Sequence, residues 1–263
     1  MSNIKLSIIL PSLRPEKLKE LLWSIETYTF IKYELIFIID SLQNFSFLEN
    51  ITLEPYLKNV TILFDDKKTG TVYPIGLGLE KSQGEYIVTL SDDCLVTPCW
   101  ADEMYDFMKS QDQSIPLLGN FRVYDTKNEY GPIGYYGKIF SMFPFIKKTD
   151  IDKIGGYYLL DFNAHYADPD LGMRVWNMGG KVISCPHAWI FHIWNGDKLH
   201  QDNYNKYFAG GSDSVTVVLE DPSVEVQNQV QGLSEVIQGE GADADKKEIR
   251  DFFYHLSDRK SVG

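Results

Sequence analysis

The chain has 263 residues, a length that suits one large or two small domains. Its residues are 44% hydrophobic and 24% charged, which is the composition of an ordinary folded protein. Its 25 Lys and Arg residues against 37 Asp and Glu residues give a net charge of −12, which argues against general binding to nucleic acid or to an anionic membrane, because both require a positive field. The apolar runs are too short to span a bilayer, and the N-terminus lacks the apolar core of a signal peptide. The three cysteines have no metal-type spacing. These features predict a reduced, cytoplasmic protein with incidental thiols.

The first hundred residues alternate between apolar runs typical of buried strands and segments typical of helices. Runs of apolar and β-branched residues without polar alternation predict strands covered on both faces, at residues 4–10, 33–39, 60–64 and 86–90. Pro15 begins a predicted amphipathic helix, whose apolar side carries Leu18, Leu21, Leu22 and Ile25. A short helix is expected within residues 41–59, and another after the glycine-rich start of residues 67–84. This order predicts an α/β protein whose mostly parallel central sheet is flanked by helices.

Acidic residues follow three of these strands directly, namely Asp40, the pair Asp65 and Asp66, and the pair Asp92 and Asp93. Ligands of open α/β sheets bind beyond the carboxyl ends of the strands. Two adjacent carboxylates repel each other unless a cation lies beside them, and hard oxygen ligands suit Mg²⁺ or Mn²⁺. A helix N-cap or an Asx turn is the alternative explanation for one such pair. Acids after three successive strands indicate a nucleotide and metal site along one edge of the sheet.

The second part of the chain predicts shorter elements. A helix is expected from about Trp100 to Gln111, with Thr97 as its N-cap, followed by a strand at residues 115–124. Residues 125–145 are rich in Gly, Tyr and Phe, which indicates a hairpin and a loop over a pocket. The elements expected after it are a strand at 143–147, helices at 149–154 and from Asp168 to about Met178, and strands at 181–184 and 188–192. Glycine pairs at 155–156 and 179–180 end the two helices.

Composition changes sharply near residue 209. Residues 209–251 contain no aromatic residue, and residues 211–263 carry 11 acidic against 5 basic residues. Helical spacing of apolar residues within this segment indicates short helices separated by a linker. We therefore expect residues 209–263 to form an acidic, partly flexible, helical or extended appendage that packs weakly, binds a protein partner or self-associates.

Four blocks of the sequence, taken in order, resemble the GT-A glycosyltransferases, and specifically the inverting enzymes of family 2. The blocks are LSIILPSLRP, LIFIID, GLGLEKSQGEYIVTLSDDCLVTPCW and IGGYYLLDFNAHYADPDLGMRVWNMGGKVISCPHAWIFH, which together cover about residues 4–195. The resemblance implies the GT-A (nucleotide-diphospho-sugar transferase) fold for residues 1–208. Within it, a nucleotide-binding half would occupy about residues 1–98 and an acceptor-binding half about residues 99–208.

The resemblance also implies a nucleotide site at the ends of the first two strands. Pro11 and Ser12 would lie against the nucleoside, and Arg14 occupies a position that is often basic in this family. Asp40 would accept a hydrogen bond from the base, although a turn-forming role after a strand is the alternative. Asp66 matches a further base contact, and Lys68 lies where a side chain reaches the diphosphate or the sugar.

The acidic metal motif of the family matches Ser91-Asp92-Asp93, with Ser91 in place of the first acid of the common Asp-x-Asp form. By resemblance Asp93 would be the direct ligand of Mn²⁺ or Mg²⁺, and Asp92 would hold the sugar or the waters of the metal. His192 matches a histidine that often completes the metal site or contacts phosphate, although a lone His after an apolar strand is more often structural. The metal would neutralise the nucleoside diphosphate as the glycosidic bond breaks.

The catalytic base of the family matches Asp168, preceded here by Ala167 where most members have Glu. A carboxylate is needed because a hydroxyl is a poor nucleophile until its proton is removed. Asp before Pro is also a good helix N-cap, which is the alternative role of Asp168.

The function implied is transfer of a sugar from a UDP- or dTDP-linked donor to a hydroxyl of a glycan or another acceptor, with inversion. Two alternatives stay open. A non-catalytic nucleotide- or carbohydrate-binding module of the same fold would explain the missing acids at Ser91 and Ala167. A nucleotidyltransferase is the weaker alternative, because PSLRPEKL lacks the glycine-rich, basic loop that such enzymes carry after the first strand.

Overall fold

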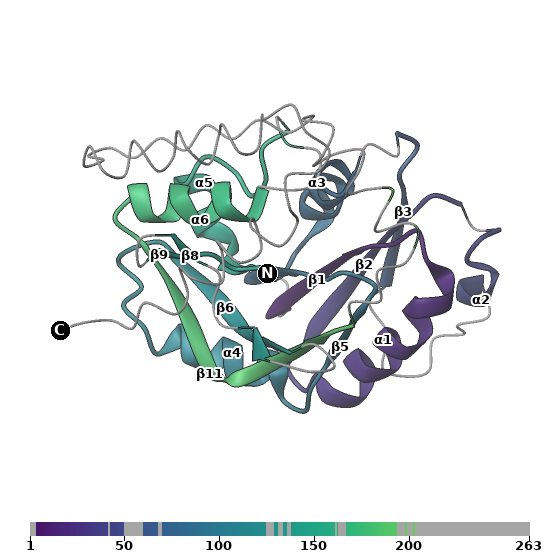
Figure 1. Ribbon diagram of the computed structural model, residues 1–263, viewed down its shortest axis with the longest axis horizontal. Coiled ribbons are helices and arrows are strands. Elements are labelled where there is room, and N and C mark those ends of the chain that lie inside the picture. The colour runs from purple at the N-terminus through teal and green to yellow at the C-terminus, as the bar shows by residue number, and fades with distance from the viewer. Residues whose placement is uncertain are drawn as a thin grey trace, which may run out of the picture.

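The computed structural model describes residues 4–41, 43–49, 60–67, 70–124, 129–130, 134–135, 138–160, 162, 167–193, 198 and 202. These residues form one nine-stranded sheet with helices on both faces, together with a separate two-stranded hairpin (Figure 1). Lys68 and the predicted appendage at residues 209–263 lie outside the described residues.

The first half of the sheet is parallel and has the strand order β3–β2–β1–β4. Its strands are β1 (Leu6–Pro11), β2 (Tyr33–Ile39), β3 (Val60–Phe64) and β4 (Tyr86–Thr89). The helices between them are α1 (Pro15–Tyr28), α2 (Ser46–Glu49) and α3 (Val72–Lys81). These elements confirm the predictions from the apolar runs, apart from small differences at the ends. Since all four strands are parallel, their carboxyl ends meet at one edge of the sheet.

The second half of the sheet is mixed. Strand β10 (Phe145–Lys147) runs antiparallel to β4 and to β6 (Leu117–Tyr124), and β11 (Lys181–His192) runs parallel to β6. At the edge, β5 (Cys94–Val96) pairs antiparallel with the end of β11. Inside the sheet, β7 (Glu129–Tyr130) pairs antiparallel with the end of β6. The small hairpin joins β8 (Gly134–Tyr135) to β9 (Lys138–Ile139), within the segment predicted to contain one. The predicted α/β sheet is confirmed, with parallel pairing confined to β3–β2–β1–β4 and β6–β11.

The end of the sheet differs from the prediction at two strands. Residues 181–192 form one continuous strand rather than two, with a shift in register between Ser184 and Trp189. The segments on either side of the shift both pair with β6. The expected break between two strands is therefore only a local irregularity within one strand. Strand β5 was not predicted, because three residues carry too little periodicity to identify a strand.

Two helix starts also differ from the prediction. Helix α4 (Trp100–Lys109) has Cys99 at its N-cap in the left-handed conformation, with φ of 60°. Thr97 is therefore not the cap, and its hydroxyl donates to the backbone oxygen of Trp189 at 3.0 Å. Helix α6 (Ala167–Asn177) begins before Asp168, so Asp168 lies in the first turn and is not the N-cap. The remaining helix, α5 (Lys148–Lys153), ends before Gly155 and Gly156, which both have positive φ.

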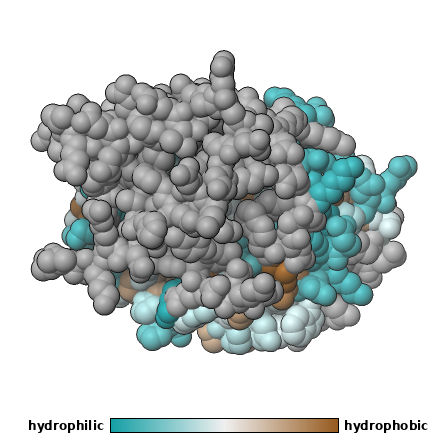
Figure 2. Space-filling view, viewed as in Figure 1, coloured by the Kyte–Doolittle hydropathy of each residue, from teal (hydrophilic) through white to brown (hydrophobic). Residues whose placement is uncertain are grey.

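The core forms two layers, one on each face of the sheet. Helices α1 and α4 pack on one face, and α3, α5 and α6 pack on the other. Described residues on the right-hand side of the view in Figure 2 are mostly hydrophilic, and apolar ones form a small area near its lower middle. The buried apolar side chains of the two clusters pack against the sheet. Within the described part of the chain, no helix combines the length and apolar character needed to cross a membrane.

A buried polar network holds the turn that leads into β4. The carboxylate of Glu34 accepts hydrogen bonds at 2.5 Å from the hydroxyl of Ser7 and from the backbone N–H of Gln83. The N–H of Gly84 donates to Ser7 Oγ at 2.8 Å and lies 3.2 Å from the same Glu34 oxygen. Because the network is buried and its donors are satisfied, it fixes the position of β4 relative to β1 and β2.

Gly84 allows this close approach, so we expect Gly84→Ala to destabilise the protein by about 1–3 kcal/mol. A Cβ atom there would lie 2.4 Å from Ser7 N and 2.7 Å from Leu6 C, and both are backbone atoms that cannot move independently. Gly76→Ala is the matched control, because a Cβ in that helical position meets nothing within 4 Å and Ala favours helix by up to about 1 kcal/mol. Urea unfolding midpoints at constant m value would measure both changes. Equal midpoints for Gly84→Ala and the wild type would contradict the packing argument.

Candidate active site

The two segments that follow β1 and β4 bring polar side chains together at the carboxyl ends of these strands. The hydroxyl of Ser12 donates to Asp92 Oδ2 at 2.6 Å. Arg14 Nη2 contacts Asp92 Oδ1 and lies 3.1 Å from Asp93 Oδ2. Asp92 and Asp93 are 4% and 3% exposed, so both carboxylates are removed from bulk water. The guanidinium of Arg14 thus supplies the positive charge that two adjacent buried acids require.

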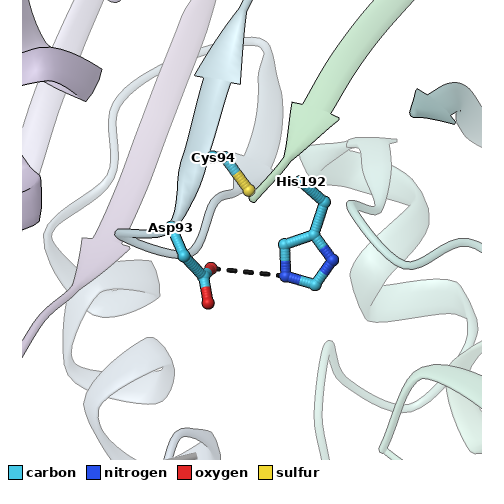
Figure 3. Close-up of side chains that lie close together, drawn as sticks. All are labelled: Asp93, Cys94 and His192. Carbon is cyan, nitrogen blue, oxygen red and sulfur yellow. Dashed lines mark ion pairs between the residues drawn. The ribbon is translucent and has the colours of Figure 1, made fainter. Parts of the chain in front are cut away.

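The pairing of β5 with β11 adds His192 to this cluster. His192 is in register with Cys94, and the N–H of Ile193 donates to the backbone oxygen of Asp93 at 2.7 Å. The side chains of Asp93 and His192 point toward each other, with Nε2 3.3 Å from Oδ1 (Figure 3). The rings of Phe143 and His192 form a T-shaped pair, with 5.7 Å between their centroids. The last strand therefore holds His192 against an acid that lies far from it in the sequence.

Asp93 is ionised at neutral pH. Burial by itself would raise the pKa of Asp93, but hydrogen bonds from His192 and Ser91 and the positive charge of Arg14 hold it well below its usual range. Ser91 contributes directly, since its hydroxyl donates to Asp93 Oδ1 at 2.5 Å. A carboxylate that remains charged in a buried position is suited to bind a cation.

The donor atoms of Asp93, Cys94 and His192 all lie within 4.8 Å of one another. A carboxylate oxygen, an imidazole nitrogen and a thiol sulfur are ligands of divalent metal ions in proteins. Asp93 and His192, the two predicted metal ligands, therefore lie next to each other, and their role as ligands stays a prediction. Cys94 was interpreted as incidental, because its partner His192 is far away in the sequence and no Cys/His spacing marks the pair.

Asp168 lies beside a pair of tyrosines that reach the end of β4. The hydroxyl of Tyr158 donates to Asp168 Oδ1. The hydroxyl of Tyr157 lies 3.1 Å from Thr89 Oγ1 and donates to the backbone oxygen of Pro144 at 3.1 Å. Burial raises the pKa of Asp168 to about 7, and the hydrogen bond from Tyr158 offsets part of this rise. Asp168 is therefore a carboxyl group that exchanges a proton near neutral pH, and Tyr158 is a contact that the sequence did not single out.

The remaining predicted nucleotide contacts lie along the same edge of the sheet. Pro11 is the last residue of β1, and Asp40 follows β2 and accepts from Asn44 Nδ2 at 3.2 Å. After β3, Asp65 is buried and accepts from the N–H of Lys67 at 2.9 Å, whereas Asp66 is exposed. The strand order therefore places Pro11, Asp40 and Asp66 at neighbouring strand ends, where Asp66 is exposed and the other two are partly buried.

A parallel β3–β2–β1–β4 half, a mixed second half and a buried acidic pair at the end of the central strand define the GT-A class of glycosyltransferase fold. Residues 7–167 match the family described as glycosyl transferase family 2, and the chain belongs to that family. A search of curated proteins finds no match.

Solved structures show the same fold. The chain is similar to residues 1–349 of S. aureus TarS, with a TM-score of 0.60 and 13% identity, covering 72% of this chain and 60% of that one. The UDP complex of TarS 1–349 gives a TM-score of 0.59 and 14% identity, covering 75% and 63%. GalNAc-T7 with UDP, GalNAc and Mn²⁺ gives a TM-score of 0.64 and 15% identity, covering 97% and 54%. This chain thus spans less than two thirds of the length of each of these proteins, and the likeness is one of fold.

Proposed function

We propose that this protein is an inverting glycosyltransferase that moves a sugar from a UDP- or dTDP-linked donor to an acceptor hydroxyl. The observation that carries the proposal is the placement of two chemically different acids around the end of β4. Asp93 is held ionised beside His192, as a cation site requires, and Asp168 has a pKa of about 7, as a general base requires. The complexes of TarS with UDP and of GalNAc-T7 with UDP and Mn²⁺ favour a uridine nucleotide.

The nucleotide would lie across the ends of β1, β2 and β3. We assign Pro11 and Ser12 to the nucleoside, Asp40 to an N–H of the base and Asp66 to a further base contact. Asp40 suits this role because its carboxylate is only partly buried and already accepts from an amide N–H, that of Asn44. Lys68 remains a predicted diphosphate or sugar contact.

Asp93 and His192 would hold a divalent ion of the Mn²⁺ or Mg²⁺ class, and a bound ion would neutralise charge on the leaving diphosphate. Arg14 adds a fixed positive charge at the same place, since its guanidinium contacts both Asp92 and Asp93. Ser12 and Arg14 hold the two oxygens of Asp92, and we assign Asp92 to the sugar or to the waters of the metal. The chain's own residues therefore bind and orient the diphosphate end of the donor.

Asp168 would remove the proton from the acceptor hydroxyl. The acceptor oxygen attacks the anomeric carbon from the face opposite the diphosphate, the bond from that carbon to the diphosphate oxygen breaks, and the proton passes to the Asp168 carboxylate. Tyr158 orients this carboxylate through its hydrogen bond to Oδ1.

This assignment predicts a rate of transfer that rises with pH. At pH values below its pKa of about 7 the Asp168 carboxyl is protonated and cannot accept a proton. The transfer rate should therefore fall about tenfold per pH unit below this pKa and level off at higher pH. Initial rates at subsaturating acceptor, measured across this range with saturating donor, would test the prediction.

Tyr158→Phe provides the matched variant for that profile. Its hydroxyl lowers the pKa of Asp168, so its removal should displace the acid limb to higher pH. Donor affinity, measured by calorimetry over the same range, should remain unchanged in this variant. A profile that is flat on the acid side in the wild-type protein would contradict the role of Asp168.

A non-catalytic binding module of the same fold is the second candidate, favoured by Ser91 and Ala167 at positions that are usually acidic. Thermal-shift measurements across nucleotide-sugars, with and without Mn²⁺, would first identify the donor, because a bound ligand stabilises the folded state. Donor hydrolysis and transfer assays would then decide between the two. Binding without turnover of any donor would favour the module.

A further inference from the structure

We propose that Cys94 is a third metal ligand, which completes a carboxylate–thiolate–imidazole set with Asp93 and His192. This set prefers a thiophilic divalent ion such as Zn²⁺ or Co²⁺ over Mg²⁺, because thiolate is a soft ligand and Mg²⁺ demands oxygen. The inference rests on the proposed function only in placing the metal beside Asp93. What it adds is the identity of the ion that binds preferentially beside Asp93.

The strand pairing places the three side chains together. Cys94 begins β5 and His192 ends β11, and the two are paired in register, so their side chains lie on the same face of the sheet. Figure 3 shows the sulfur, the carboxylate and the imidazole directed into a common space. Because the backbone of Asp93 is hydrogen-bonded to Ile193, all three residues belong to one rigid unit.

The separations of the donor atoms suit one ion. Two bonds of about 2.0–2.1 Å at a tetrahedral angle place nitrogen and oxygen ligands about 3.3 Å apart. Asp93 Oδ1 and His192 Nε2 are 3.3 Å apart. With a Zn–S bond of about 2.3 Å the sulfur should lie about 3.5 Å from the other two donors, and in the structure all three donor atoms lie within 4.8 Å of one another.

Ser91 adds an independent reason. Its hydroxyl lies 3.1 Å from Cys94 Sγ and donates to Asp93 Oδ1 at 2.5 Å, so it contacts two of the three ligands. An acid at position 91, as in the common form of the motif, would repel a thiolate and a carboxylate at these distances. With Ser91 in place of an acid, the site lacks one hard oxygen ligand. It also lacks the negative charge that would repel a Cys94 thiolate.

The charges of this set also balance. Asp93 and a Cys94 thiolate carry two negative charges, equal to the charge of the ion, and the thiol proton is released to solvent when the metal binds. Arg14 contacts Asp92 and lies 3.1 Å from Asp93 Oδ2, so its single positive charge offsets the second acid of the pair. Three protein ligands leave the fourth position of a tetrahedral ion open, as in catalytic rather than structural zinc sites, and a diphosphate oxygen could occupy it.

Titration of the full chain with Co²⁺ tests the proposal without any donor or activity. We expect the wild-type protein to show a sulfur-to-cobalt charge-transfer band in the near ultraviolet and visible bands typical of a tetrahedral ion. Cys94→Ser should lose the charge-transfer band and bind Co²⁺ at least about tenfold more weakly, since even partners of metal ligands contribute about 10–100-fold. Cys99→Ser is the matched control and should keep the band, because Cys99 lies at the start of α4 outside the cluster.

Co²⁺ binding without the band, a band that persists in Cys94→Ser, or no binding at all would each overturn the proposal. X-ray absorption of the zinc-loaded wild-type protein gives the same decision without a variant, since a sulfur at about 2.3 Å is distinct from a shell of nitrogen and oxygen alone. UDP binding with Mn²⁺ in the same samples separates this result from the proposed function. Donor binding without a sulfur ligand would remove Cys94 from the site and leave the transferase assignment standing.

Discussion

Asp168→Asn is expected to lower the rate of sugar transfer by about 10²- to 10⁴-fold while leaving donor binding unchanged. Asn has nearly the same shape as Asp and can still accept a hydrogen bond from Tyr158, so the fold around α6 should persist. Its amide cannot take a proton from the acceptor hydroxyl. Donor binding should survive because the proposed nucleotide contacts lie at the ends of β1, β2 and β3, whereas Asp168 belongs to α6. Single-turnover transfer and calorimetry with UDP would measure the two effects separately.

Asp170→Asn is the matched control on the same helical turn. Asp170 accepts a hydrogen bond from Arg174 Nε at 2.8 Å, and Arg174 also donates to the backbone oxygens of Ile154, Gly156 and Tyr157. Its carboxylate therefore holds a structural Arg, and its loss should lower stability slightly with little change in the transfer rate. Full transfer activity in Asp168→Asn, or a loss confined to Asp170→Asn, would refute the base assignment.

Asp93→Asn should lower metal-dependent donor binding and turnover by at least about 10²-fold, a loss comparable with removal of one preorganised charge-stabilising group. The substitution removes the charged ligand but preserves the shape of a residue that is 3% exposed. It also removes the negative charge that faces both Arg14 and His192, at 3.1 and 3.3 Å. Arg14 would still attract the diphosphate, so residual donor binding should become independent of metal.

Calorimetry with UDP in the presence and absence of Mn²⁺ measures this dependence directly. The wild-type protein should gain affinity when Mn²⁺ is added, and Asp93→Asn should not. Asp106→Asn provides a control with the same change in net charge, because Asp106 is exposed on α4. Metal-dependent binding of equal strength in Asp93→Asn and Asp106→Asn would show that Asp93 is not a ligand.

The first half of the fold follows from local sequence patterns. Each of β1, β2, β3 and β4 is an uninterrupted apolar run, and such a run is stable only when both faces of the strand are covered. Alternation of these runs with helical segments then leaves a parallel sheet as the expected arrangement, whose carboxyl ends share one edge. For this reason the sequence predicts that the residues following β1 and β4 lie along the same edge of the sheet.

Short elements and distant contacts were not predictable in this way. Cys94–Val96 becomes a strand only because it pairs with the end of β11, and β11 is continuous only because β6 supports it on both sides of the register shift. The contact of Tyr158 with Asp168, which joins a loop to a helix, leaves no periodic signal either. The strand propensity of two or three residues is weak, so pairing with neighbouring strands in the tertiary structure decides whether such a segment becomes a strand.

By itself, therefore, the sequence determined the parallel half of the sheet and the acids at its edge, because apolar periodicity and strand-end residues are local properties. The family was indicated by the resemblance of four ordered sequence blocks. Only the tertiary structure decided that Arg14 bridges Asp92 and Asp93, that His192 and Cys94 face Asp93, and that Asp168 has a pKa of about 7. Each of these depends on distance and burial between segments far apart in the chain. Distance and burial determine the strength of a charge interaction, and residue type alone does not.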